Sequence, residues 1–543
     1  MKNSTKPNLF LAFACLYFLC TAIYAQNLNI IGVNLLQAVG TNVNGTGIRV
    51  GQPEAPNDAN GVDWEVNPAN VPQPVSLFTY NSNGVTSTTF PNSLGGDSSH
   101  ADAVGQCFYG PSTGVATNVA HVDNYNANYF VQERLSVIGS TTNYTISLPA
   151  NNINDSVVNQ SFIFANSDSS HVSSNEQAAI DTGYDNYAAK FNTLFVSGAG
   201  NGGPTIINPP ATCYNGISVG ASDGPSSTGP TVDNGRCKPD IVAPGGETSF
   251  STPFVAGSAA VLMQAGLRGD GGSDTNSATN MITVKALLLN GAVKPTDWTN
   301  IAPSPLDFRY GAGVLNVFNS YEELTGGKHG YNFSTNYSLN APHLPVTTTA
   351  AIPVLNGWDC NTNTSSPTND EVNHYFFNIT NGTRGATFSL TATLVWNRHQ
   401  NKTAINNLGL YLYNTANNSL VGSSTSVVDN VQHVFIPQLL QGRYDLQVWK
   451  AGGSGIVSGS EPYGLAWAMV SESLKVSRSG TNLFLSWPVY PAGFAVGSTS
   501  SLNPPVTWST NNIPPPIYTN NQNVVWLSAT NSEQFFRLQT PDF

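Results

Sequence analysis

Residues 245–266 read GGETSFSTPFVAGSAAVLMQAG. A glycine-rich turn here leads into a run of small and apolar residues, and Ser249 stands where the predicted helix begins. Free N–H groups and the positive end of the dipole at a helix N-terminus stabilise the negative oxygen that forms in acyl transfer. Serine is also a common helix N-cap. Alone, the stretch therefore predicts either a nucleophile or a capping serine before a closely packed helix.

The surrounding sequence, from about residue 28 to 325, alternates short apolar runs with helical stretches. The apolar runs are GIRVG (47–51), SVVNQSFIF (156–164), TLFVSGAG (193–200) and NGISVGA (215–221). The helical stretches are SHADAVGQCFYG (99–110), YDNYAAKF (184–191) and STPFVAGSAAVLMQAGL (251–267). Such alternation predicts an α/β domain over residues 26–330, with a parallel sheet covered by helices on both faces. Strands buried on both sides explain the continuous apolar runs.

The pattern changes to a period of two after this domain. In TFSLTATLVW (387–396) every second residue, from Phe388 to Trp396, is apolar or small. NLGLYLYN (407–414) and GRYDLQVWK (442–450) alternate in the same way. This pattern predicts a β-sandwich over residues 340–470, followed by a small β-module over residues 471–543.

Charge and the N-terminal segment limit the function classes. The 543-residue chain has a formal net charge of −12, which argues against nucleic-acid binding. Lys2 and Lys6 precede an apolar run from Leu9 to Ile23, and Ala25 is a suitable cleavage edge. Residues 1–25 are therefore predicted to be a signal peptide of an exported protein that starts near Gln26. No later apolar stretch is expected to span a membrane.

Four cysteines remain after the signal peptide, at positions 107, 213, 237 and 360. Their spacing does not match a zinc motif. An exported protein can form disulfides, and Cys213 and Cys237 are the favoured pair. Cys107 fits a small buried apolar residue.

The segment TSFSTPFVAG resembles the nucleophile motif of subtilisin-like serine proteases, the subtilases, with Thr248, Ser249, Pro253 and Gly257 in register. Five further blocks stand in the family's order. They are HADAVGQCFYG (100–110), LFVSGAGN (194–201), NPPATCYNGISVGASD (208–223), GRCKPDIVAPG (235–245) and RYGAGVLNVFNSY (309–321). The resemblance covers about residues 30–325, and six blocks in order are specific where one would not be.

The resemblance implies a subtilisin-like three-layer fold and a secreted serine endopeptidase that acts on polypeptides. It assigns Ser249 as nucleophile, His100 as base and Asn201 as an oxyanion-hole donor. It also implies that the strand SVVNQSF (156–162) pairs with the substrate backbone as an added edge strand. No cofactor is required for the chemistry, and the resemblance leaves structural calcium open.

The residue types agree with these roles. A serine hydroxyl needs an adjacent base, and histidine titrates near neutral pH. Of the three histidines in the domain, His100 opens a helix of small residues, whereas His121 and His171 lie in polar, loop-like sequence.

The sequence departs from the family at the acid and beside the nucleophile. The family's triad acid is an aspartate at the end of the first strand, and Glu54 takes that place here, with Asp58 and Asp63 as alternatives. Pro53 suggests that regular strand pairing stops at Gly51.

The other departure is Glu247, which stands where the family has glycine and brings a carboxylate close to Ser249. These departures keep a catalytically silent, secreted subtilase-fold binding protein as an alternative. The C-terminal modules, in a third interpretation, carry surface or polysaccharide contact while the protease acts on nearby material.

Overall fold

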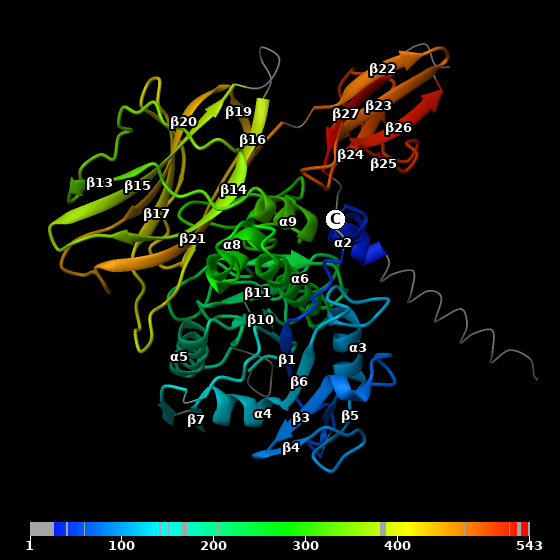
Figure 1. Ribbon diagram of the computed structural model, residues 1–543, viewed down its shortest axis with the longest axis vertical. Helices are drawn as coiled ribbons and strands as arrows, with labels where there is room; N and C mark the ends of the chain where they lie inside the picture. Colours follow the sequence, from blue (N-terminus) through cyan, green and yellow to red (C-terminus); the bar gives the residue numbers. More distant parts are fainter. Residues whose placement is uncertain are drawn as a thin grey trace, which may run out of the picture.

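The computed structural model describes eleven stretches of the chain, and the predicted signal peptide lies outside them. The described residues are 26–39, 42–58, 60–140, 143–149, 151–164, 171–204, 207–380, 387–471, 473–520, 522–528 and 534–540. Three parts follow one another along the chain: an α/β part, a large pair of β-sheets and a small β part (Figure 1).

The α/β part is built on an eight-stranded sheet with the order β12-β11-β10-β9-β1-β6-β3-β4. All neighbouring strands are parallel except β4, which is antiparallel to β3. Every residue of β9, β10 and β11 is buried, which accounts for their continuous apolar sequence. The strands are β1 (Arg49–Glu54), β3 (Phe78–Ser82), β4 (Val85–Ser87), β6 (His121–Asn126), β9 (Val157–Gln160), β10 (Leu194–Gly198), β11 (Gly216–Ala221) and β12 (Ile241–Ala243).

Helices cover both faces of this sheet. Tyr184 of α5 (Ser174–Phe191) stacks edge-on against Phe195 of β10, with ring centroids 5.0 Å apart. Helix α6 (Thr248–Arg268) approaches the same strand at Gly198, where a Cβ atom would lie 3.0 Å from a side-chain oxygen of the helix. Residues 195 and 198 of a strand point to opposite faces. The predicted three-layer arrangement is therefore confirmed.

Helices α3 (Ser99–Phe108) and α6 lie side by side on one face. A Cβ atom on Gly257 of α6 would lie 2.7 Å from Val115 Cβ and 3.2 Å from Phe108 O, so only glycine fits this crossing. At the other end of the two helices, the rings of His100 and Phe250 have centroids 5.9 Å apart. These two contacts bring the N-termini of α3 and α6 to the same place.

Shorter elements complete this part. They are α2 (Val33–Val39), β2 (Asp63–Glu65), β5 (Gly96–Asp97), α4 (Ala127–Tyr129), β7 (Val137–Ser140), β8 (Asn143–Ile146), α7 (Thr275–Ala278), α8 (Met281–Asn290) and α9 (Val317–Thr325).

The second part consists of two antiparallel sheets, with the orders β13-β15-β20-β17-β18 and β14-β21-β16-β19. Their strands are β13 (Phe333–Ser338), β14 (Asn356–Thr364), β15 (Asn369–Ile379), β16 (Thr387–Trp396), β17 (Leu408–Asn414), β18 (Ser419–Ser424), β19 (Val431–Leu440), β20 (Gly442–Lys450) and β21 (Ser460–Val470). The alternate residues Phe388 to Trp396 lie in one buried cluster with Leu410 and Leu446, so the predicted inner faces are confirmed. Strand β13 precedes residue 340, the predicted start of the sandwich.

The third part has a four-stranded sheet, β22-β23-β26-β25, and the pair β24-β27. Its small core contains Leu485, Trp487, Val496 and Val525. The strands are β22 (Lys475–Ser479), β23 (Asn482–Pro488), β24 (Ala495–Thr499), β25 (Ile517–Thr519), β26 (Gln522–Ser528) and β27 (Phe535–Gln539).

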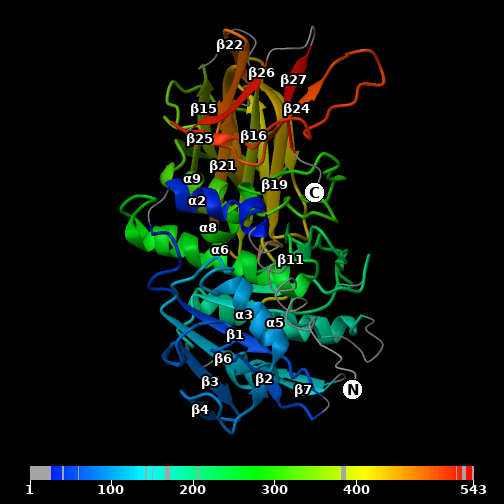
Figure 2. The ribbon, with the colours of Figure 1, turned by 90° about the vertical axis from the view of Figure 1, so that its right-hand side faces the viewer.

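The sandwich is docked directly on the α/β part. All ten residues of α8 are buried, and this helix lies between the large sheet and the sandwich strands (Figure 2). A Cβ atom on Gly464 of β21 would lie 2.6 Å from Ile282 O, so the strand backbone meets the helix backbone. Trp358 and Ala466 of the sandwich belong to the same buried cluster as the core of the α/β part.

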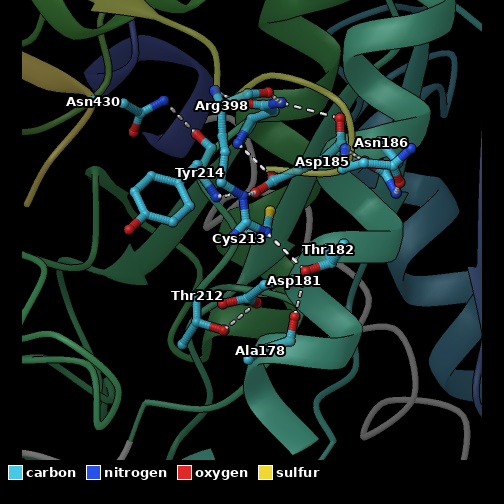
Figure 3. A network of polar contacts seen from close by, with 12 residues as sticks. Ala178, Asp181, Thr182, Asp185, Asn186, Thr212, Cys213, Tyr214, Arg398 and Asn430 are labelled. Atoms are coloured by element: carbon cyan, nitrogen blue, oxygen red, sulfur yellow. Dashed lines mark hydrogen bonds and ion pairs between the residues drawn. The ribbon is translucent and has the colours of Figure 1, made fainter. Parts of the chain in front are cut away.

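A polar network also joins these two parts (Figure 3). Arg398, in the loop after β16, places Nε 2.7 Å from an oxygen of Asp185 on α5 and lies over the ring of Tyr214. The backbone N–H of Arg398 donates to Asn215 Oδ1 at 2.7 Å. Asn430 Nδ2 donates to the carbonyl oxygen of Tyr214 at 2.9 Å. The ion pair is almost fully buried, with 6% and 1% of the two side chains exposed.

The favoured disulfide between Cys213 and Cys237 is wrong, because the four described cysteines are free thiols. Cys237 Sγ lies 3.3 Å from Leu306 O, and Cys213 Sγ fills the space above Gly216. Both side chains act as small buried apolar groups.

The sequence was not expected to contain a membrane-spanning stretch after the signal peptide, yet α6 has the length and apolar character of one. Among the described residues it is the one helix that is long and apolar enough to cross a membrane, and 89% of its apolar window is buried inside the protein. Its apolar character serves the core of the α/β part.

Candidate active site

Glu54 and His100 meet where β1 ends and α3 begins. Ser98 caps α3 through a hydrogen bond from Ala101 N, which places His100 in the first turn. His100 Nδ1 lies 3.0 Å from Glu54 Oε2. The carboxylate is buried, with 1% of the side chain exposed, whereas 30% of the histidine side chain reaches solvent.

A buried glutamine holds the other carboxylate oxygen. Gln52 Nε2 donates to Glu54 Oε1 at 2.9 Å and to Ala101 O of α3, also at 2.9 Å. Tyr109 Oη donates to Gln52 Oε1 at 2.5 Å, which fixes the orientation of the amide. Sequence analysis missed Gln52, although residues two apart in a strand share a face and so mark it as a neighbour of Glu54.

The prediction that pairing stops at Gly51 is wrong on one side of β1. Pairing with β9 ends at Gly51, but pairing with β6 continues through Pro53 to Glu54, opposite Asn126. Because β9 and β1 diverge after Gly51, Pro53 can stay in the sheet although it has no N–H to donate.

The alternative acids and histidines lie in other surroundings. Asp58 accepts hydrogen bonds from the backbone of Asn60, Val62 and Asp63, as a turn residue does. His121 contacts Thr79 on the neighbouring strand. His171 contacts a backbone carbonyl of the loop at 207.

Ser249 lies in the first turn of α6, two residues after the N-cap Glu247. Pro253 has no N–H, so the carbonyl of Ser249 lacks its usual partner four residues later in the helix. Ser161 Oγ donates to this carbonyl at 2.7 Å and replaces that hydrogen bond. The segment after β9 is thereby tied to the candidate nucleophile.

The expected edge strand for substrate needs correction. Strand β9 pairs with β1 on one side and β10 on the other, so it lies inside the sheet. The segment that follows it, residues 161–163, instead lines an open cleft of about 350 Å³. The cleft is also lined by Gly198, Gly200, Asn201, Gly202, Ser227, Thr248 and Ser249.

Asn201 is held by the residue before Ser249. Its Oδ1 accepts from Thr248 N at 3.0 Å and from Thr248 Oγ1 at 2.9 Å. Its Nδ2 lies 3.5 Å from Glu247 Oε2, at the long limit for a hydrogen bond. The two hydrogen bonds from Thr248 therefore fix the plane of the amide, and its nitrogen makes only a long contact with Glu247.

In the described part of the chain no hydrogen bond joins His100 to Ser249. The histidine ring contacts Phe250, the residue after Ser249. Hydrogen bonds of this kind are often long without substrate and tighten in the substrate complex.

Two carboxylates control the charge of His100. Burial lowers the pKa of His100, but the hydrogen bond and charge of Glu54, together with the charge of Glu247, outweigh it and raise the pKa above the usual value. The structure thus favours the imidazolium that forms when the ring takes up a proton. Among the described residues, no group of three or more His, Cys, Asp or Glu side chains is arranged to hold a metal ion.

Residues 102–313 match the family model described as the subtilase family. This range contains Asn201 and Ser249 and begins after Glu54 and His100.

Similar solved structures include the prenylagaramide maturation protease PagA, with 18% identity, TM-score 0.35, and coverage of 55% of this chain and 99% of that chain. A protease from Pseudoalteromonas arctica has 17% identity, TM-score 0.32, and coverage of 52% and 91%. Tripeptidyl peptidase 2 has 13% identity, TM-score 0.31, and coverage of 75% and 43%. The match to the subtilase family thus covers residues 102–313, less than half of the 543-residue chain.

Proposed function

We propose that the protein is an exported serine endopeptidase that hydrolyses peptide bonds through an acyl-enzyme. The observation that carries the proposal is the buried contact of 3.0 Å between Glu54 and His100, made at the helix end that adjoins Ser249. In this assignment Ser249 is the nucleophile, His100 the general base, Glu54 the acid of the triad and Asn201 an oxyanion-hole donor.

The first step transfers a proton from Ser249 Oγ to His100 Nε2 while Oγ attacks the peptide carbonyl carbon. Glu54 accepts the Nδ1–H of His100, which keeps Nε2 free to take the proton. Its charge then stabilises the imidazolium. His100 returns the proton to the leaving amine, and water releases the acyl group by the same route.

Two N–H donors are available for the oxyanion. The N–H of Ser249 lies in the first turn of α6, where backbone N–H groups have no partner in the helix. Asn201 lines the same cleft, with its amide oxygen anchored by Thr248. Loss of one such donor costs about 10²–10³ in turnover.

An open cleft and a predicted signal peptide support the finer assignments. Residues 161–163 present backbone beyond the end of β9, where an extended chain can lie and be cut internally. Export is tested by sequencing the N-terminus of the protein recovered from the culture medium, which we expect to start near Gln26. Internal cuts in a substrate with blocked ends, identified by mass spectrometry, test endopeptidase action.

The central experiment is covalent labelling with a fluorophosphonate probe. We expect the wild-type protein to label, Ser249→Ala to lose labelling and all peptide hydrolysis, and Ser258→Ala to keep both. Ser258 is a matched control because it lies on the same helix and its hydroxyl donates only to Phe254 O. Labelling of folded Ser249→Ala protein at the wild-type level would overturn the assignment.

One observation favours the alternative of a silent binding protein. Glu247 places a carboxylate oxygen 3.5 Å from Asn201 Nδ2, where it competes with the oxyanion for this donor. A folded wild-type protein that neither labels nor cleaves, but regains labelling in Glu247→Gly, would support this alternative.

A further inference from the structure

A second cavity, of about 430 Å³, lies where the three parts of the protein meet. One wall is the end of α8 with the loop after it and α9, and another is the outer face of β16, β19 and β21. The third wall comes from the small β part, through residues 490–494 and 538–540. Figure 1 shows α8 and α9 beside the sandwich, with β24 and β27 nearby. We call this space the junction cavity.

An amine that forms no ion pair within the described part of the chain lines the junction cavity. Lys294 is buried, with 8% of the residue exposed, and among the described residues its Nζ makes one hydrogen bond, to Ala292 O at 3.2 Å. The rings of Trp298 and Phe435 lie 5.5 Å and 5.4 Å from the amine. Burial lowers the pKa of Lys294 to about 7, and the charge of Glu323 offsets only part of this effect.

An acid and a phenol line the same cavity. Glu323 of α9 is 1% exposed, and its Oε2 has no hydrogen-bond partner among the described residues. Burial raises the pKa of Glu323 well above its usual value, although Asn290 and Lys294 oppose the shift. Tyr490 Oη, from the small β part, likewise has no partner in the described part of the chain.

These groups do not satisfy one another. Lys294 and Glu323 act on each other's charge, but no ion pair joins them among the described residues. Buried polar groups without partners are costly, and apolar cavities with a few convergent polar groups are typical ligand sites. The volume lies within the range of small-molecule pockets.

We propose that the junction cavity binds a small zwitterion with an apolar side chain, the class of amino acids and short peptides. The ligand carboxylate takes the place of a counterion for Lys294, and its ammonium group donates to Glu323. The apolar side chain lies among the rings of Trp298, Phe435 and Phe494. This site is separate from the Ser249 cleft and does not depend on the proposed peptide hydrolysis.

Calorimetric titration of the full-length protein with L-phenylalanine at pH 7 tests the proposal. N-acetyl-L-phenylalanine lacks the ammonium group, and L-phenylalaninamide lacks the carboxylate. We expect each analogue to bind about 10- to 100-fold more weakly than the zwitterion, the loss that one charge-assisted hydrogen bond produces. No binding of L-phenylalanine, or equal binding of all three compounds, would overturn the proposal.

Variants locate the binding site. Lys294→Met should lose at least tenfold in affinity without a lower unfolding midpoint, because it replaces a buried unpaired amine with an apolar chain of similar length. Glu323→Gln should weaken the binding of L-phenylalanine, while the affinity for the N-acetyl compound should stay within about twofold of the wild type. Lys402→Met, on an exposed lysine, and Ser249→Ala should bind like the wild type. Unchanged affinity in Lys294→Met, or lost binding in Ser249→Ala, would refute the junction cavity as the site.

Discussion

Replacing Glu54 by glutamine is expected to reduce turnover by about 10⁴, because the surrounding hydrogen bonds dictate how the new amide must lie. Gln52 presents an N–H to position 54, and Tyr109 and Ala101 hold it in that orientation. The oxygen of the new amide must therefore face Gln52, and its NH₂ must face His100 Nδ1. That arrangement makes Nδ1 an acceptor and puts the proton on Nε2, where the base needs a lone pair.

The opposite orientation of the new amide, with its oxygen toward His100, does not restore activity. It sets the NH₂ of residue 54 against the NH₂ of Gln52, and a buried unsatisfied donor costs about 1–3 kcal/mol. The substitution also removes the negative charge that faces the imidazolium, worth about 4 kcal/mol at an effective dielectric constant of 20. Together these costs are about 5–7 kcal/mol, or a factor of about 10⁴–10⁵ in rate.

The assay measures kcat on an unstructured peptide, with folded protein quantified by circular dichroism. Asp58→Asn is the matched control, because Asp58 is a partly exposed turn residue near Glu54 in sequence. Glu54→Asp should also reduce kcat by about 10², since its carboxylate falls about 1 Å short of His100. The reasoning is refuted if Glu54→Gln stays within a few-fold of wild type while Asp58→Asn or Asp63→Asn destroys activity.

Three further outcomes are expected. Glu247→Gln removes a charge that raises the pKa of the histidine, so the acid limb of the pH profile of kcat/KM should move to lower pH; an unmoved limb would contradict this role. Arg398→Ala leaves Asp185 buried without its ion pair and should cost about 3–5 kcal/mol, seen as a lower unfolding midpoint. Cys213 and Cys237 should resist iodoacetamide in the native protein and react after unfolding without reductant, whereas a disulfide would keep them unreactive.

The sequence was informative where local patterns decide structure. Small residues in α6 predicted a close-packed helix: the helix approaches the sheet at Gly198 of β10, and its own Gly257 approaches the end of α3. Period-two alternation correctly predicted the inner face of β16, because each side chain of a strand points to a fixed face. The register of Glu54 with the family strand placed it where His100 lies.

Contacts between segments that are far apart in the chain could not be predicted from the sequence. Arg398 sits in an ordinary polar loop, and nothing near it in sequence indicates Asp185, which lies more than 200 residues earlier. A disulfide between Cys213 and Cys237 was expected only because exported proteins can form disulfides. In the structure Cys237 Sγ contacts Leu306 O, and Cys213 Sγ packs against Gly216. The junction cavity combines residues from all three parts, so it has no local pattern to recognise.

The complete burial of α8 has a consequence for the order of synthesis. A ribosome makes residues 281–290 long before Gly464 and Trp358 exist to cover them. A nascent chain that ends near residue 330 therefore carries an apolar helix facing water and an Asp185 that awaits Arg398. Roughly 140 more residues must follow before this helix is covered, so emergence of the sandwich sets the earliest time at which α8 is fully buried.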